Sequence, residues 1–221
     1  MGTSDATGTW RGASSAGDTL RAQRSLIDVS ALPTVVFGSR ATTWWGMICF
    51  MAIEGTTLAI CVASYFYLRK NFTAWPPEGT RSPSLLIPTI SIVALLGSNG
   101  LAWAMDRAAK EENFARTKVL LVVSTFVGLG LFGLRLLEFR SLNTTWDANA
   151  YGSIAWATMG MHASLLLMDT METGGLAIVY LLGRAQRKHY VHASENAIYW
   201  FFTTLSWVPL YVAIFWGPRF L

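Results

Sequence analysis

WWGMICFMAIEGTTLAICVASYFYL, residues 44–68, is an apolar run with aromatic residues at both ends and one acid, Glu54, near its middle. About 20 mostly apolar residues are needed for a helix to cross the hydrocarbon core of a bilayer, and Trp and Tyr gather at its two interfaces. The run therefore predicts a transmembrane helix. Four more stretches of this kind follow, at residues 85–105, 118–139, 153–183 and 197–217. We predict an all-α, polytopic membrane bundle of about five transmembrane helices over residues 41–221.

The composition agrees with a membrane protein. Of the 221 residues, 52% are hydrophobic and 14% are charged, whereas a soluble domain has about 25% charged residues. The net charge is only +4, and the basic residues are spread over the predicted loops. No basic stripe of the kind that binds nucleic acid is present, so we exclude that class of function.

The N-terminal residues and the charged loops predict the orientation. Residues 1–40 are rich in Gly, Ser, Thr and Ala and contain no apolar core of signal-peptide length, which predicts a flexible cytoplasmic arm and not a cleaved export signal. This arm and the loops 106–118 and 184–195 hold eleven of the 17 Lys and Arg residues, and five lie on the other side. By the positive-inside rule the N-terminus is cytoplasmic and the C-terminus is outside. In the 106–118 loop we expect two ion pairs at i,i+4 spacing, Asp106–Lys110 and Glu112–Arg116.

Several ionisable residues lie within the predicted spans, where a charge is costly and calls for a partner or a function. Glu54 is near mid-depth, so we interpret it as a functional buried acid or as an acid with a specific partner. His162, Asp169 and Glu172 share one face of the fourth span. That face predicts either a proton relay or a hydrogen-bonded packing seam.

Arg135 and Glu138 lie three residues apart near the outer end of the third span. This spacing predicts an ion pair with a structural role, or a clamp for a lipid phosphate.

The small number of histidines in the spans argues against a redox centre, because a bis-histidine heme needs two ligands at membrane depth and a copper site needs two or three. Only His162 is at depth, while we place His189 and His192 in a cytoplasmic loop. We therefore predict that this chain has no catalytic centre and binds neither heme nor copper nor another metal.

Five short motifs, in order along residues 40–221, resemble those of subunit III of the heme-copper oxidases, the cytochrome c oxidase subunit III family. The motifs are Trp44-Trp45-Gly46-Met47 with Glu54, Trp75-Pro76-Pro77, Leu137-Glu138-Phe139, Tyr151-Gly152-Ser153 with Gly160 and His162, and Glu195-Asn196-Ala197 with Tyr199-Trp200-Phe201 and Trp207. In this resemblance Glu54 matches the family's buried glutamate. The chain departs from the family at four positions, which are Arg135, Leu165, Phe201 and Thr204, and it lacks two N-terminal helices, as shorter bacterial versions do.

The resemblance implies a non-catalytic subunit of a bacterial aa3/caa3-type cytochrome c oxidase in the cell membrane. Subunit I would hold heme a, heme a3 and the active-site copper, and subunit II would receive electrons from cytochrome c. The complex would reduce dioxygen to water and pump protons, while this chain would stabilise subunit I, support its proton uptake and contact phospholipids. Two alternatives stay open from the sequence: an accessory subunit of a nitric oxide reductase, and a small membrane transporter or scaffold.

Overall fold

The computed structural model describes residues 35–220, and every regular element in this range is a helix. Five helical spans are long and apolar enough to cross a membrane: Thr42–Arg69, Leu86–Lys110, Phe114–Ser141, Ala150–Leu181 and Arg187–Phe220. The predicted all-α bundle with about five membrane spans is therefore confirmed. Our prediction of a flexible arm over residues 1–40 falls almost wholly outside the described range.

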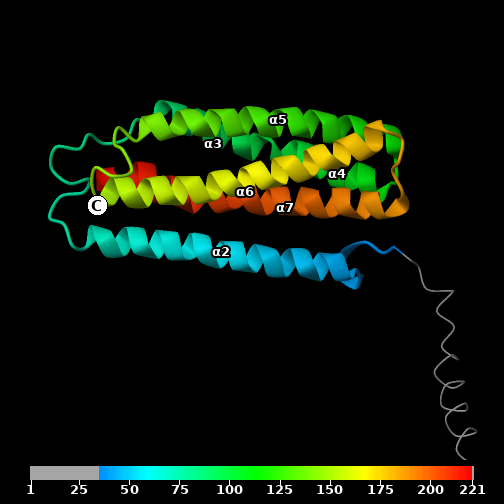
Figure 1. Cartoon of the computed structure of the whole chain (residues 1–221), viewed down its shortest axis with the longest axis horizontal. Helices are drawn as coiled ribbons and strands as arrows, with labels where there is room; N and C mark the ends of the chain where they lie inside the picture. Colours follow the sequence, from blue (N-terminus) through cyan, green and yellow to red (C-terminus); the bar gives the residue numbers. More distant parts are fainter. Residues whose placement is uncertain (1–34, 221) are drawn as a thin grey trace, which may run out of the picture. The chain divides into compact units, whose positions relative to one another are not determined.

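Consecutive spans run in alternating directions (Figure 1). Their elements are η1 (Gly38–Arg40), α2 (Thr42–Arg69), α3 (Leu86–Gly97), α4 (Asn99–Lys110), α5 (Phe114–Ser141), α6 (Ala150–Leu181), α7 (Arg187–Tyr211), the π-helix η2 (Val212–Trp216) and α8 (Gly217–Phe220). The start of α2 and the connections 111–113 and 182–186 lie at one end of the bundle, and the connections 70–85 and 142–149 lie at the other (Figure 1).

The helix α2 is the most peripheral of the spans. It packs along α6 and α7, whereas α5 packs on α6, α3 and α4 (Figure 1). Only 11% of the most apolar window of α2 is buried, against 56% in the last span. Large apolar side chains such as Ile53, Ile60 and Tyr67 therefore stay uncovered by the rest of the described chain.

The last span begins earlier than the sequence suggested. We placed residues 184–195, with His189 and His192, in a loop, but α7 starts at Arg187 and carries both histidines. The backbone N–H of Gln186 donates to Nδ1 of His189 at 2.8 Å, and the N–H of His189 donates to the carbonyl of Gln186 at 2.9 Å. These reciprocal bonds start a helix whose first turns are polar, so hydropathy alone missed them.

Only one of the two predicted ion pairs in the 106–118 region forms. Lys110 and Asp106 pair at 2.7 Å. Glu112 does not pair with Arg116, because α4 ends at Lys110 and Glu112 adopts a positive φ of 50°. Its carboxylate instead binds Arg187 at the start of α7, at 2.8 Å.

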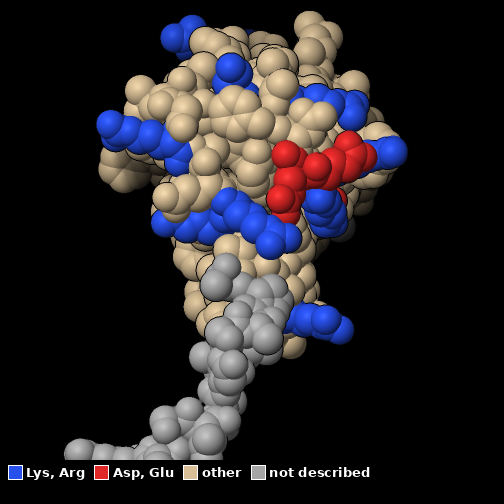
Figure 2. Space-filling model, turned by 90° about the vertical axis from the view of Figure 1, so that its right-hand side faces the viewer, with Lys and Arg blue, Asp and Glu red and all other residues tan. Residues whose placement is uncertain are grey.

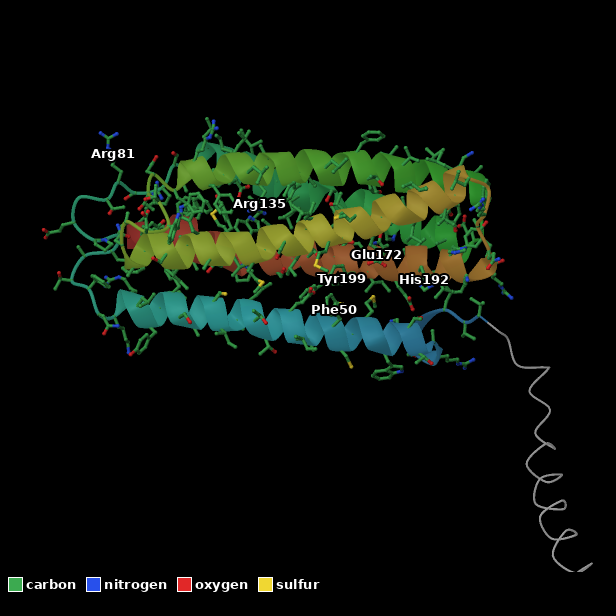
Figure 3. The ribbon with its side chains drawn as sticks, in the orientation of Figure 1. Phe50, Arg81, Arg135, Glu172, His192 and Tyr199 are labelled. Carbon is green, nitrogen blue, oxygen red and sulfur yellow. The ribbon has the colours of Figure 1, made fainter. Side chains whose placement is uncertain are left out.

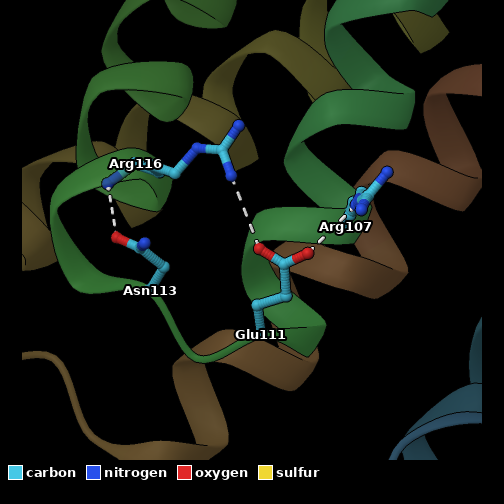
Figure 4. Close-up of polar contacts among 4 residues, drawn as sticks. All are labelled: Arg107, Glu111, Asn113 and Arg116. Carbon is cyan, nitrogen blue, oxygen red and sulfur yellow. Dashed lines mark hydrogen bonds and ion pairs between the residues drawn. The ribbon is translucent and has the colours of Figure 1, made fainter.

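The turn between α4 and α5 is held by its own polar contacts (Figure 4). Asn113 caps α5 by accepting a hydrogen bond from the backbone N–H of Arg116 at 3.1 Å. The carboxylate of Glu111 lies between Arg107 and Arg116, at 3.0 and 3.5 Å. Figure 2 shows this end of the bundle, where Lys and Arg side chains surround a small acidic group.

Candidate functional site

The carboxylate of Glu54 is held by a single hydrogen bond to α7. The hydroxyl of Tyr199 donates to Oε2 of Glu54 at 2.6 Å, and the Glu54 residue is 8% exposed. Phe50, one helical turn earlier on α2, stacks on the Tyr199 ring with centroids 6.1 Å apart. The mid-membrane acid thus has the specific partner that the sequence left open, and this contact joins α2 to α7.

A groove of about 590 Å³ lies between α2, α6 and α7 on the N-terminal side of Glu54. Figure 3 shows Phe50, Tyr199, Glu172 and His192 between α2 and the α6–α7 pair. Its lining is Thr43, Gly46, Met47, Phe50, Met168, Asp169, Glu172, His192, Glu195, Asn196 and Tyr199. The α2 side contributes mainly apolar atoms, and the α6–α7 side contributes three carboxylates. The hydroxyl of Thr43 donates to Glu195 at 2.7 Å, which is a second polar link between α2 and α7.

The three polar residues of the fourth span do not share one environment. His162 and Asp169 are buried in the core, whereas Glu172 is exposed to the groove. The ring of His162 donates from Nε2 to the carbonyl of Thr203 at 2.8 Å. Asp169 accepts from the Asn196 side chain at 2.7 Å. These bonds form a polar seam between α6 and α7, and the proton-relay hypothesis stays a prediction.

Arg135 and Glu138 form a buried ion pair on α5. Their side chains are 1% and 0% exposed, so they lie in the core and away from the lipid-facing surface. The guanidinium carbon of Arg135 lies 3.5 Å from the ring centroid of Trp207, whose ring is also 4.7 Å from that of His162. This burial argues for a self-neutralising pair and against the lipid-phosphate clamp.

Sequence reasoning missed the α7 side of these contacts. Asn196, Tyr199, Thr203 and Trp207 are the partners of Asp169, Glu54, His162 and Arg135 respectively. Their spacing of three and four residues places all four on one helical face. That periodic polar face was a readable signal for a helix buried against other helices.

The described residues offer no cluster suited to a metal. Over residues 35–220, no group of three or more His, Cys, Asp and Glu side chains is placed to hold an ion. The Nε2 atom of His162 is already bonded to a backbone carbonyl. The expected lack of heme and copper in this chain stays a prediction.

The fold and this site define a multi-pass helical membrane protein whose buried polar side chains mainly bind one another. Comparison with known proteins then gives the family: the cytochrome c oxidase subunit III profile matches residues 34–218. The chain belongs to the cytochrome c oxidase subunit III family, and the resemblance found in its motifs is confirmed. Its family forms part of a respiratory oxidoreductase complex.

Individual relatives agree with the profile. Cytochrome c oxidase subunit 3 of Synechocystis sp. is 22% identical over 177 residues, which cover 77% of this chain and 74% of that protein. The probable cytochrome c oxidase subunit 3 of Nocardia farcinica is 26% identical over 180 residues, covering 77% and 85% respectively. The Artemia franciscana subunit 3 is 27% identical over 190 residues, covering 82% and 70%.

Proposed function

We propose that the chain is a non-catalytic subunit of a bacterial aa3/caa3-type cytochrome c oxidase. In this proposal it stabilises subunit I and supports its proton uptake, while subunit I holds heme a, heme a3 and copper and subunit II receives electrons from cytochrome c. Membership in the subunit III family supports a cytochrome c oxidase complex. The expected alternatives, a nitric oxide reductase subunit and a transporter or scaffold, gain no specific support from the contacts described above.

The proposed role in proton uptake rests on the position of Glu54. An acid at the centre of a membrane helix costs roughly 2.5–3.5 kcal/mol on insertion scales, so its retention needs a compensating contact. Tyr199 supplies one hydrogen bond, and Tyr199 also lines a groove that holds Asp169, Glu172 and Glu195. We propose that this groove faces proton-carrying water or a bound phospholipid on the cytoplasmic side.

Two matched variants separate the carboxyl group from its hydrogen bond. In Glu54→Gln the amide oxygen still accepts from the Tyr199 hydroxyl, but the acid is gone. In Tyr199→Phe the acid stays and the bond is lost. If the carboxyl group serves proton supply, Glu54→Gln assembles with unchanged heme spectra but loses proton ejection or inactivates sooner, whereas Tyr199→Phe is affected less.

The measurement is oxygen consumption against time at matched heme content, together with proton ejection from vesicles that contain the purified complex. If oxygen consumption and proton ejection by Glu54→Gln match the wild type over many turnovers, the Glu54 carboxyl group has no role in proton supply and the chain acts as a scaffold. A stronger defect in Tyr199→Phe than in Glu54→Gln would assign the site to helix packing. The heme spectrum of the co-purified partner also tests the complex: heme a bands support the oxidase, and b-type bands alone would favour the reductase.

A further inference from the structure

A second groove lies at the end of the bundle opposite the start of α2. It has a volume of about 450 Å³, and its walls are the end of α5, the connection 142–149 and the second turn of α6. The lining residues are Leu136, Phe139, Arg140, Asn143, Thr144, Thr145 and Trp156. None of them lines the groove between α2, α6 and α7, so the two grooves are separate. Arg140 is in the last turn of a membrane-spanning helix, which places this groove at a membrane–water interface.

The groove carries a positive charge that has no counter-ion in residues 35–220. Arg140 is exposed, and no carboxylate of these residues lies within 4.0 Å of its guanidinium. The lining itself contains neither Asp nor Glu. Thr145 is exposed as well, and its hydroxyl has no hydrogen-bond partner among the same residues. A guanidinium and a hydroxyl, both hydrogen-bond donors, are therefore open to an anion.

An apolar face of α5 leads from Arg140 toward the middle of the membrane. Leu129, Gly133, Leu136 and Arg140 follow one another at spacings of three and four residues, so they lie on one side of the helix. Leu129 and Leu136 are 49% and 52% exposed, and a Cβ at Gly133 would meet no atom within 4 Å. The missing side chain at Gly133 leaves a shallow gap between the two leucines. This face therefore suits an apolar chain that runs along the helix below the arginine.

The polar end of the groove is held in place by contacts within the chain. The indole N–H of Trp156 donates to the Thr144 carbonyl at 2.9 Å, and the Trp156 ring centroid lies 4.7 Å from that of Phe139. The Asn143 amide donates to the Ser82 carbonyl at 2.9 Å, which ties this connection to the one before α3. These contacts exist without a ligand, so binding would order little of the chain.

We propose that this groove binds an anionic phospholipid from the leaflet at this end of the bundle. Arg140 and the Thr145 hydroxyl bind the phosphate, and an acyl chain lies along Leu136 and Gly133. A guanidinium suits a phosphate because it can donate two parallel hydrogen bonds to two of its oxygens. The apolar face and the donors thus follow one another along the membrane normal, in the order of a lipid's chain and headgroup.

The charge of the lining favours a lipid with a net negative headgroup. A zwitterionic headgroup also carries an ammonium, and no carboxylate lines the groove to bind it. The proposal moves the lipid-phosphate clamp that the sequence suggested for Arg135 to Arg140, further along the same helix and at its exposed end. It rests on this groove alone and not on the proposed role in proton uptake.

Photolabelling of the purified complex in vesicles tests the site. The probe is a phosphatidylglycerol with a diazirine in one acyl chain, present at a low mole fraction in phosphatidylcholine. Light should attach it to the peptides that contain Leu136 or Trp156, and mass spectrometry identifies them. A phosphatidylethanolamine with the same labelled chain should label these peptides several-fold less. Equal labelling by both probes, or no label on these peptides, would overturn the proposal.

Three variants test the donors. Arg140→Gln should lower the labelling by phosphatidylglycerol roughly tenfold, which corresponds to about 1.4 kcal/mol of binding free energy. Lys70→Gln is the matched control, because Lys70 is exposed at the same end of the bundle and does not line the groove. Labelling that persists in Arg140→Gln, or falls equally in Lys70→Gln, would overturn the proposal. Thr145→Val keeps the shape of the side chain and should give a smaller decrease; unchanged labelling would overturn the role of the hydroxyl.

Competition separates a lipid from a free anion. Excess unlabelled phosphatidylglycerol in the vesicles should suppress the labelling, whereas inorganic phosphate in the buffer should not. Suppression by inorganic phosphate would show that the groove binds a free anion, and it would overturn the assignment to a lipid. None of these measurements uses oxygen reduction, so they can succeed or fail independently of the proposed function.

Discussion

Removing Glu138 alone should destabilise the bundle strongly, because it would leave the Arg135 guanidinium unpaired in the core. The two side chains are 1% and 0% exposed, so solvent cannot replace the lost carboxylate. Breaking a buried pair in this way costs about 3–5 kcal/mol. The cation–π contact with Trp207, at 3.5 Å, persists in Glu138→Ala but was present before the change, so it offsets none of the loss. A cost of this size shifts the unfolding equilibrium at least about a hundredfold.

The matched control replaces both partners with apolar residues of similar length. Arg135→Met with Glu138→Leu leaves no buried charge, and such replacements are often neutral or stabilising. We therefore expect the double variant to be more stable than Glu138→Ala, although it has lost more polar contacts. The single variants Arg135→Met and Glu138→Leu, with this double variant, form a double-mutant cycle that measures the coupling between the two side chains.

The assay is SDS titration of the chain in mixed micelles, followed by tryptophan fluorescence, with Trp207 adjacent to the change. It yields the free energy of unfolding for each variant. A cost below about 1 kcal/mol for Glu138→Ala would refute the argument, since that is the range of an exposed pair. A double variant as unstable as Glu138→Ala would show that the loss arises from packing and not from the unpaired charge.

Two further predictions concern helix contact and orientation. Gly128→Ala should lower the free energy of unfolding in SDS by about 1–3 kcal/mol, because a Cβ there would lie 2.6 Å from Oγ1 of Thr170. Adding Thr170→Ala should restore the stability. Gly130→Ala is the control and should cost far less, because a Cβ at Gly130 would have no atom within 4 Å. In a chain whose native cysteines are replaced, Ala148→Cys should react with an impermeant thiol reagent from outside the cell and Ala115→Cys should not, and reversed labelling would overturn the proposed orientation.

The spans could be predicted because each depends on local composition. A hydrocarbon core of fixed thickness selects apolar runs of about 20 residues, and that requirement can be read directly from residues 44–68. The start of α7 could not be read in this way. Its first turns contain Arg187, Lys188 and His189, and they form a helix through the bonds between Gln186 and His189 and not through apolar periodicity.

For a related reason, the sequence predicted the ionisable residues of the site but not their partners. The cost of charge in a membrane marks Glu54, Arg135 and Asp169 as residues that need partners, whatever the fold. Which residue becomes the partner depends on how distant helices pack, and Glu54 and Tyr199 are separated by 145 positions in the chain. The Glu112 pairing failed for a similar reason, since the predicted i,i+4 partner required an unbroken helix and the turn directs Glu112 to α7.

Because α2 packs weakly on the other helices, its few polar contacts largely determine how it is held. In a bilayer, apolar packing distinguishes poorly between another helix and lipid, so hydrogen bonds and close contacts decide which helices adjoin. Between α2 and α7 there are two gaps, the groove of about 590 Å³ and a second of about 300 Å³ on the other side of Glu54. Two side-chain hydrogen bonds hold α2 to α7 here: Glu54 accepts one from Tyr199 between the two gaps, and Thr43 donates one to Glu195 at the larger groove. The Glu54–Tyr199 bond therefore holds α2 to a residue that lines the groove, so an occupant of the groove that displaces the Tyr199 side chain would also alter how α2 is held.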